Sequence, residues 1–126
     1  MSDCGVCIGG GDYDGSLEFY DSRVIVARKS HKCEECGREI PSGQQYEYVS
    51  GKFDGDFFYV KTCMDCVDIR DGLTCNGGSI AHGQLWGELR DYGFQNMTMG
   101  CLTKLKTASA KSYLVQRWNQ WKGLAS

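Results

Sequence analysis

The chain has 126 residues, of which 41% are hydrophobic and 24% are charged. This length suits one compact domain, and this composition is globular, which excludes disorder as the main state. No apolar run approaches the roughly 20 residues that a membrane-spanning helix needs, so we expect no membrane partner. The net charge of −2 is too small to indicate an acidic or basic partner by itself.

The charges are distributed unevenly along the chain. Residues 1–22 carry five acids and no base, whereas residues 100–126 carry five bases and no acid. The molecule is therefore polarised along its sequence, which affects where a partner would dock. The alternative is that the two ends pair with each other in the fold.

Eight cysteines are the most unusual feature of the composition. Six of them form Cys-x-x-Cys pairs, namely Cys4/Cys7, Cys33/Cys36 and Cys63/Cys66, while Cys75 and Cys101 stand alone. The amino terminus lacks a secretory signal, so we expect a cytoplasmic protein, and clustered thiols in a reducing compartment usually bind metal. Soft thiolates at this spacing favour zinc.

The first 27 residues are predicted to be an acidic, glycine-rich segment. Its beginning cannot be a helix because glycine disfavours that conformation. Residues 24–27 are mostly β-branched and predict a short strand.

Residues 28–75 predict a small zinc core that begins with a knuckle. A Cys-x-x-Cys pair followed by Gly37 is typical of a zinc knuckle, because the glycine conformation lets amide groups point at the sulfurs. Residues 44–50 and 57–62 flank an Asp-Gly turn, so we expect them to form a β-hairpin.

A helix is predicted to follow the hairpin directly. Thr62 can cap it, and acids in its first turn suit the positive end of the helix dipole. Gly72 is expected to end or weaken this helix.

Two further helices are predicted, over residues 79–93 and 107–122, and residues 94–106 are ambiguous. In the second helix, one apolar stripe consists of Ala110, Leu114, Trp118 and Trp121. The expected fold class is α+β, with a single domain over 1–126. It contains a treble-clef-like core of knuckle, β-hairpin and helix, and the additional helices pack against that core.

The strongest signal for a metal site is the spacing of two cysteine pairs, with 26 residues between them. Tetrahedral zinc needs four ligands, and a knuckle, a hairpin and the first turn of a helix would bring together Cys33, Cys36, Cys63 and Cys66. The helix dipole would also stabilise the anionic thiolates. Four thiolates close the site to water, so we expect a structural zinc.

The other four cysteines carry a weaker signal. The favoured ligands of a second zinc are Cys4, Cys7, Cys75 and His82, and Cys75 with Cys101 is the alternative. We expect Cys101 to be a small buried apolar residue. His31 is interpreted as a surface residue, with a hydrogen bond to a zinc ligand as the alternative.

No catalytic constellation can be assembled from the sequence. There are two histidines, no serine in a nucleophile elbow and no phosphate-binding Gly-x-x-x-x-Gly-Lys loop. The motifs of zinc deaminases are missing, and the predicted hairpin lacks the histidine that His-Asn-His nucleases need. We therefore predict a protein that is not an enzyme and has no small-molecule substrate.

The cysteine pairs and the sequence around them also carry a family resemblance. The string Arg-Lys-Ser-His-Lys-Cys-Glu-Glu-Cys-Gly-Arg-Glu-Ile-Pro-Ser-Gly, then Asp-Gly, then Lys-Thr-Cys-Met-Asp-Cys lies within residues 28–66. It resembles a family of uncharacterised small zinc-binding proteins of tailed phages and prophages. More distantly, it is similar to LIM and other treble-clef modules. The resemblance implies that these four cysteines bind zinc and that the protein works in a bacterial host cell, and it implies no activity.

Three function classes follow. The favoured one is a phage accessory protein that docks on a host protein or ribonucleoprotein complex, for example to inhibit a defence system such as CRISPR. The alternative is a nucleic-acid-binding zinc protein that uses the basic tail and its tryptophans, although the isoelectric point near 5.6 argues against it. A metal-dependent enzyme is disfavoured. The predicted partner surface consists of Lys111, Tyr113, Arg117 and Lys122.

Overall fold

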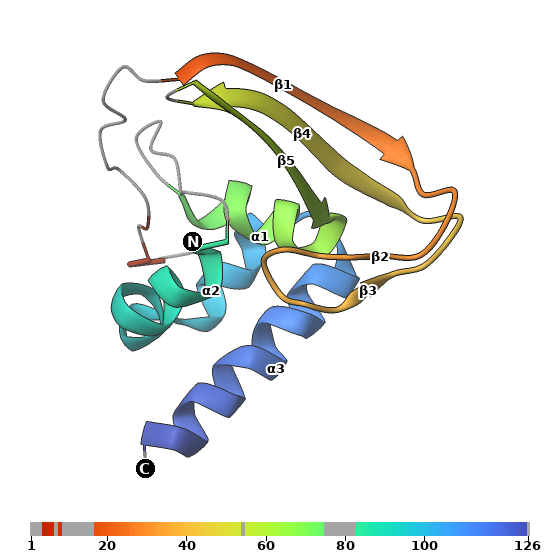
Figure 1. The fold of residues 1–126 in the computed structure, drawn as a ribbon. Helices are drawn as coiled ribbons and strands as arrows, with labels where there is room; N and C mark the ends of the chain where they lie inside the picture. Colours follow the sequence, from red (N-terminus) through yellow and green to blue (C-terminus); the bar gives the residue numbers. More distant parts are fainter. Residues whose placement is uncertain (1–3, 7, 9–16, 54, 75–82, 126) are drawn as a thin grey trace.

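The computed structural model describes residues 4–6, 8, 17–53, 55–74 and 83–125. The strands are β1 (Leu17–Val26), β2 (His31–Lys32), β3 (Glu39–Ile40), β4 (Gln45–Phe53) and β5 (Asp56–Cys63). The helices are α1 (Met64–Leu73), α2 (Leu85–Glu88), the π-helical turn η1 (Leu89–Gly93), the 3-10 turns η2 (Phe94–Asn96) and η3 (Met99–Lys104), and α3 (Ala108–Ala125). The fold is therefore mixed α+β, as the sequence predicts (Figure 1).

The main sheet has three antiparallel strands in the order β1-β4-β5. The hairpin β4-β5 confirms the prediction from the Asp-Gly turn, where Gly55 has φ +83°. Strand β1 is longer than predicted, since it begins at Leu17 inside the acidic segment. The reason is long-range: its backbone pairs with β4 along nearly its whole length.

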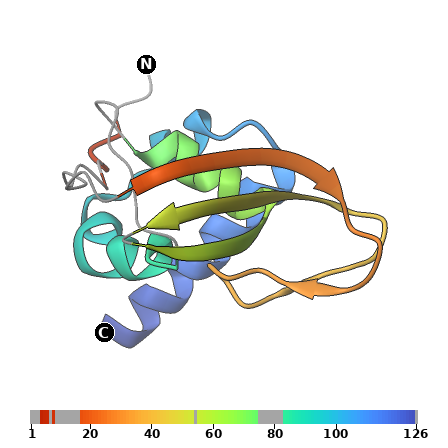
Figure 2. The same ribbon diagram turned by 45° about the horizontal axis from the view of Figure 1, so that its top comes forward.

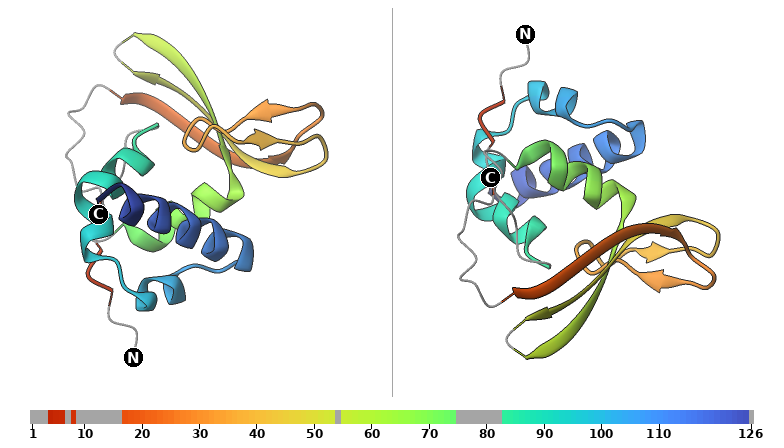
Figure 3. Two further views of the ribbon diagram at one scale, coloured as in Figure 1. Left: turned by 90° about the horizontal axis from the view of Figure 1, so that it is seen from below. Right: turned by 90° about the horizontal axis from the view of Figure 1, so that it is seen from above.

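The two faces of the sheet have different neighbours. The inner face packs on α1, and Val49 and Thr62 on this face are fully buried. On the same face, the guanidinium nitrogens Nη1 and Nη2 of Arg70 in α1 donate to the Glu47 carboxylate at 2.9 and 2.8 Å. Figure 2 shows the sheet in front and the helices behind it, and the two views in Figure 3 place the helices on one side of the sheet. The outer face is therefore not covered by any described helix.

Helix α1 differs from the sequence expectation at both ends. The Thr62 hydroxyl does not cap it: Cys63 is the N-cap residue without a side-chain hydrogen bond, and Thr62 is buried in the sheet, its hydroxyl having no partner among the described residues. Gly72 does not end the helix, which continues to Leu73. A Cβ at Gly72 would lie 2.9 Å from the carbonyl oxygen of Lys104, so glycine permits the close approach of the turn η3.

The carboxyl-terminal helices form the second part of the core. The helix predicted over 107–122 is confirmed as α3, in which Ala110 and Leu114 are fully buried and Trp118 and Trp121 pack against the core. The helix predicted over 79–93 is a short α2 followed by the π-helical turn η1, and its first four residues lie outside the described residues.

The amino-terminal residues join this helical part. Val6 and Ile8 are buried, and the Ile8 amide donates to the Leu73 carbonyl at 3.2 Å. Cys4 forms a disulfide with Cys101 of η3 across a sequence separation of 97 residues. None of the described helices combines the length and the apolar character that a bilayer crossing requires.

Candidate metal centre

Four cysteine sulfurs from three elements meet at one point. Cys33 and Cys36 lie in the loop between β2 and β3, Cys63 ends β5, and Cys66 lies in the first turn of α1. Their Sγ atoms all lie within 4.8 Å of one another, and Cys33 and Cys66 are almost completely buried. The spacing of the two Cys-x-x-Cys pairs thus correctly predicts a cluster that could hold a metal ion.

The backbone of the β2-β3 loop is shaped around the first sulfur. Gly37 has φ +77°, a conformation that glycine adopts without steric cost, and its amide donates to the Cys33 carbonyl at 2.9 Å. The amides of Glu35 and Cys63 donate to the Cys33 Sγ at 3.4 and 3.3 Å. Amide donors stabilise negative charge on a sulfur, so this loop is suited to a thiolate.

The two acids between Cys33 and Cys36 attach the loop to other elements. The Glu34 carboxylate accepts a hydrogen bond from the Lys61 amide of β5 at 2.7 Å. The Glu35 carboxylate accepts from the amides of Gly83 and Leu85 at the start of α2, at 2.9 and 3.0 Å. These backbone anchors hold the first cysteine pair against the second.

Arg38 is the main basic residue at the cluster. Its guanidinium donates to Cys36 Sγ at 3.4 Å, to Cys63 Sγ at 3.7 Å and to the Asp65 carboxylate at 3.1 Å. The same guanidinium lies over the Tyr113 ring, with 3.4 Å from its carbon to the ring centroid. Arg38 therefore links the sulfurs to α3 and offsets part of their negative charge.

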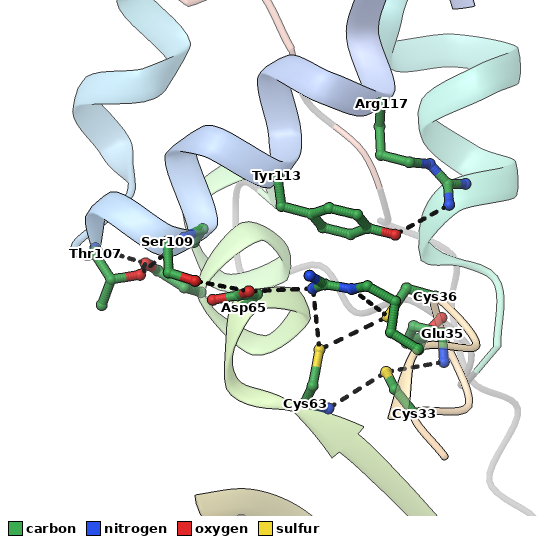
Figure 4. A network of polar contacts seen from close by, with 12 residues as sticks. Cys33, Glu35, Cys36, Cys63, Asp65, Thr107, Ser109, Tyr113 and Arg117 are labelled. Carbon is green, nitrogen blue, oxygen red and sulfur yellow. Dashed lines mark hydrogen bonds and ion pairs between the residues drawn. The ribbon is translucent and has the colours of Figure 1, made fainter. Parts of the chain in front are cut away.

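Two carboxylates of α1 bind the start of α3, as Figure 4 shows for Asp65. Asp65 accepts a hydrogen bond from the Ser109 hydroxyl at 2.9 Å, and Asp68 accepts from the Lys106 and Thr107 amides. The Thr107 hydroxyl in turn accepts from the Ala110 amide at 3.2 Å. The two acids that the sequence assigns to the dipole of α1 thus also bind the residues at the start of a second helix, Asp68 through backbone amides and Asp65 through a hydroxyl.

The four neighbouring sulfurs shift one another's pKa values in different directions. Hydrogen bonds from Cys33, Cys63 and Cys66 lower the pKa of the Cys36 thiol. The bond with Cys36 raises the pKa of Cys33, but bonds with Cys63 and Cys66 lower it to about 6. Hydrogen bonds to Cys33 and Cys36, together with burial, raise the pKa of Cys63 and Cys66. Without a metal, the shifts therefore favour negative charge on Cys33 and Cys36 and protons on Cys63 and Cys66.

The expected second quartet is wrong for Cys4. In the structure its sulfur is bonded to Cys101, and a sulfur in a disulfide is not a thiolate ligand. Cys101 is buried, as predicted, but it also forms the disulfide with Cys4, which the sequence did not indicate. The other three expected ligands, Cys7, Cys75 and His82, lie outside the described residues.

The predicted partner surface on α3 is only partly exposed. Tyr113 is 8% exposed and packs edge-on against Trp86, and the Arg117 guanidinium stacks 4.4 Å from the same indole and donates to the Tyr113 hydroxyl. These two residues contact each other and Trp86, so Tyr113 is buried and Arg117 is half-buried. Lys111 is half-buried, and Lys122 is exposed with its amine over the Trp118 ring.

His31 has an aromatic neighbour. Its ring is half-buried and lies 5.3 Å from the Tyr46 ring. Partial burial and the charges of Lys61 and Lys29 lower its pKa.

Comparison with protein-family models, curated proteins and solved structures finds no match for this chain.

Proposed function

We propose that the cysteine cluster is a structural zinc site. In a regular tetrahedron with zinc–sulfur distances of about 2.3 Å, sulfurs lie about 3.8 Å apart, and the Cys36 and Cys63 Sγ atoms are 3.8 Å apart. The donor set is four sulfurs without oxygen or nitrogen, which favours zinc among common divalent ions. The order of loop, hairpin and helix, with one cysteine pair on the loop and one at the start of the helix, supports a treble-clef-like core.

The zinc supplies stability instead of chemistry. Four sulfurs fill a tetrahedral shell, so the ion keeps no open position for water or a substrate. Arg38 bonds two of the sulfurs from outside and further restricts access. These features support a protein that works by binding and not by catalysis.

The binding surface is the outer face of the sheet. The observation that carries this proposal is the exposure of two neighbouring aromatic residues of β5, since Phe57 is 62% and Tyr59 is 60% exposed. Large exposed aromatic side chains are typical of interaction sites. This face replaces the α3 surface, whose Tyr113 and Arg117 are engaged inside the molecule.

The partner in this proposal is a macromolecular complex of a bacterial host. The resemblance of residues 28–66 to phage zinc proteins suggests this setting, and a defence complex such as CRISPR is the target it favours. The comparisons add no support to this setting. Direct contact with nucleic acid is the second candidate, favoured by the basic residues that accompany the aromatic ones.

Affinity capture from a bacterial lysate, with and without nuclease, tests the proposal. The matched pair of variants is Phe57→Ala with Tyr59→Ala on the sheet, and Tyr92→Ala with Met99→Ala, whose parent residues are 62% and 65% exposed elsewhere. We expect the parent and the second variant to retain a partner that the first variant loses. Equal capture by all three proteins would contradict the assigned surface.

A further inference from the structure

The outer face combines aromatic rings with basic side chains. Paired residues of neighbouring strands share a face, so Arg23, Tyr48 and Lys61 form one row across β1, β4 and β5. Lys52 and Phe57 form a second row toward the β4-β5 turn. Tyr59 lies between the two rows on β5, on the same side because side chains alternate along a strand.

The rings are arranged as a short ladder. Phe57 and Tyr59 are two residues apart on one strand, which separates them by about 6.8 Å. The Tyr48 and Tyr59 rings are 6.2 Å apart and tilted by 32°. The ring of Phe57 also lies 5.3 Å from the Lys52 amine. Rings at this separation can each accept a flat ligand group on an exposed surface.

Basic residues continue beyond the ladder to an open pocket. The pocket lies where β1 ends and is lined by Ile25, Val26, Arg28, Lys29, His31 and Tyr46. Arg28 and Lys29 are exposed. The outer face and this pocket therefore form one surface with cations at both ends.

The acids near this surface are fewer and partly engaged. Asp21 is paired with Arg23 at 2.6 Å, Glu34 accepts the Lys61 amide at the edge of β5, and Glu39 accepts from the Ser30 hydroxyl beside Lys29. Asp56 lies at the β4-β5 turn, and Glu47 points to the opposite face, where it bonds Arg70. The described part of this surface is thus positive, although the whole chain carries a net charge of −2.

We propose that this surface binds a single-stranded polynucleotide, and this inference rests on the proposed function as a binding module. Bases stack on aromatic rings while cations contact the phosphates, and this combination is typical of proteins that bind single strands without sequence preference. A duplex keeps its bases stacked inside, so it cannot use the ladder. Because the contacts involve the faces of the bases and the phosphates, we expect single-stranded DNA and RNA to bind with similar affinity.

Binding of a fluorescein-labelled oligothymidylate of about 12 nucleotides, followed by anisotropy, tests the proposal. We expect the parent protein to bind this probe and an oligouridylate of equal length similarly, and a duplex of the same length much more weakly. Phe57→Ala with Tyr59→Ala should weaken binding about thirtyfold, since each lost stacking contact costs about fivefold or more. Tyr92→Ala with Met99→Ala should leave binding unchanged.

Charge reversal provides an independent readout. Arg28→Glu with Lys29→Glu should weaken binding strongly. Lys104→Glu with Lys106→Glu, at the end of η3 and just after it, lies outside this surface and should have a small effect. The logarithm of the affinity should fall with the logarithm of salt concentration with a slope of about −3, for phosphate contacts by Arg28, Lys29, Lys52 and Lys61. Circular dichroism and metal content establish that each variant is folded.

The possible outcomes separate this inference from the proposed function. Equal or tighter duplex binding, or single-strand binding that the ladder variant does not weaken, overturns the inference. Failure to bind any oligonucleotide overturns it as well, but leaves the proposed function intact if a nuclease-resistant partner is still lost on Phe57→Ala with Tyr59→Ala. Retention of that partner by the ladder variant contradicts the proposed function instead.

Discussion

The metal-centred part of the molecule and its helical part are stabilised in different ways. In residues 27–73, four sulfurs lie together, and two amides and one arginine donate hydrogen bonds to three of them. In residues 83–125, buried apolar side chains belong to a core cluster that they share with Ile40, Ile69 and Leu73, and one disulfide attaches the amino-terminal segment to η3. Both parts therefore depend on apolar burial, and the first depends in addition on the charge state of its sulfurs.

The two parts meet along α1 and α3. We expect the helical part to depend on the metal-centred part more than the reverse. Asp65 and Asp68 of α1 bind the start of α3, and Arg38 stacks on Tyr113. Loss of the metal should disturb the α3 contacts, because Arg38 and Cys66 belong to the cluster or its immediate surroundings. Loss of the disulfide should leave the cluster assembled, because none of its ligands is near Cys4 in the chain.

Removing a ligand should have the largest effect. Cys36→Ser or Cys63→Ser should abolish metal binding and unfold the protein, because structural zinc contributes on the order of 10 kcal/mol, comparable to the whole stability of a small domain. Circular dichroism and metal content measure this. Cys101→Ser is the matched control in the helical part and should stay folded with its metal. A native spectrum from metal-free protein would contradict the expectation.

The pH dependence of metal affinity is the next largest effect. The raised pKa of Cys63 and Cys66 keeps these thiols protonated without metal at neutral pH, while Cys33, with a pKa of about 6, and Cys36 are ionised. Zinc binding to the folded, metal-free cluster then displaces about two protons, whereas binding coupled to folding displaces about four, because the thiols of an unfolded chain all keep a pKa of about 8.5. Affinity should therefore fall at least about a hundredfold as pH drops from 7 to 6, and more steeply below 6, where Cys33 also protonates. Calorimetric titration in buffers of different ionisation enthalpy counts the protons that zinc displaces. A zinc affinity that does not change with pH would contradict the protonation of Cys63 and Cys66 in the metal-free cluster.

Removing the disulfide should have a moderate effect confined to stability. Cys4→Ala with Cys101→Ala opens a link across 97 residues, and such links typically contribute about 2–4 kcal/mol. Denaturant unfolding should show this loss while metal content per chain stays the same. A drop in metal content would contradict the independence of the cysteine cluster from this link.

Removing Arg38 should have the smallest of these effects. Arg38→Ala loses hydrogen bonds to sulfurs and to Asp65 at a side chain that is 41% exposed, so we expect a destabilisation of about 1–3 kcal/mol. Metal affinity should fall about tenfold or more, since groups bonded to ligands tune the site. Arg90→Ala, which breaks an exposed pair with Asp91, is the matched control and should change neither property. Equal effects of the two substitutions would show that Arg38 acts only as a surface residue.

Local patterns predicted much of the metal-centred part. The Cys-x-x-Cys spacing, Gly37 and the Asp-Gly turn each determine the backbone within a few residues, so the cluster and the β4-β5 hairpin could be read from the sequence. The stripe of α3 was also predictable, because helical periodicity is local.

Contacts between distant residues could not be predicted in the same way. Nothing near Leu17 indicates that β1 pairs with β4, and nothing near Cys4 identifies Cys101 as its partner. Arg38 follows the knuckle glycine, but its stacking on Tyr113 depends on how α3 is placed. The inward direction of Arg117 depends equally on Trp86, which a charge pattern on one helix does not reveal.

X-ray absorption at the zinc edge tests the central claim most directly, because it reports the ligands of the ion itself. Purified full-length protein should contain an ion with four sulfur neighbours at about 2.3 Å and no nitrogen or oxygen ligand. This result would establish a closed structural centre formed by Cys33, Cys36, Cys63 and Cys66. A nitrogen or oxygen neighbour in the first shell of a protein with one zinc per chain would contradict it, because the ion would then have an open or mixed site suited to chemistry.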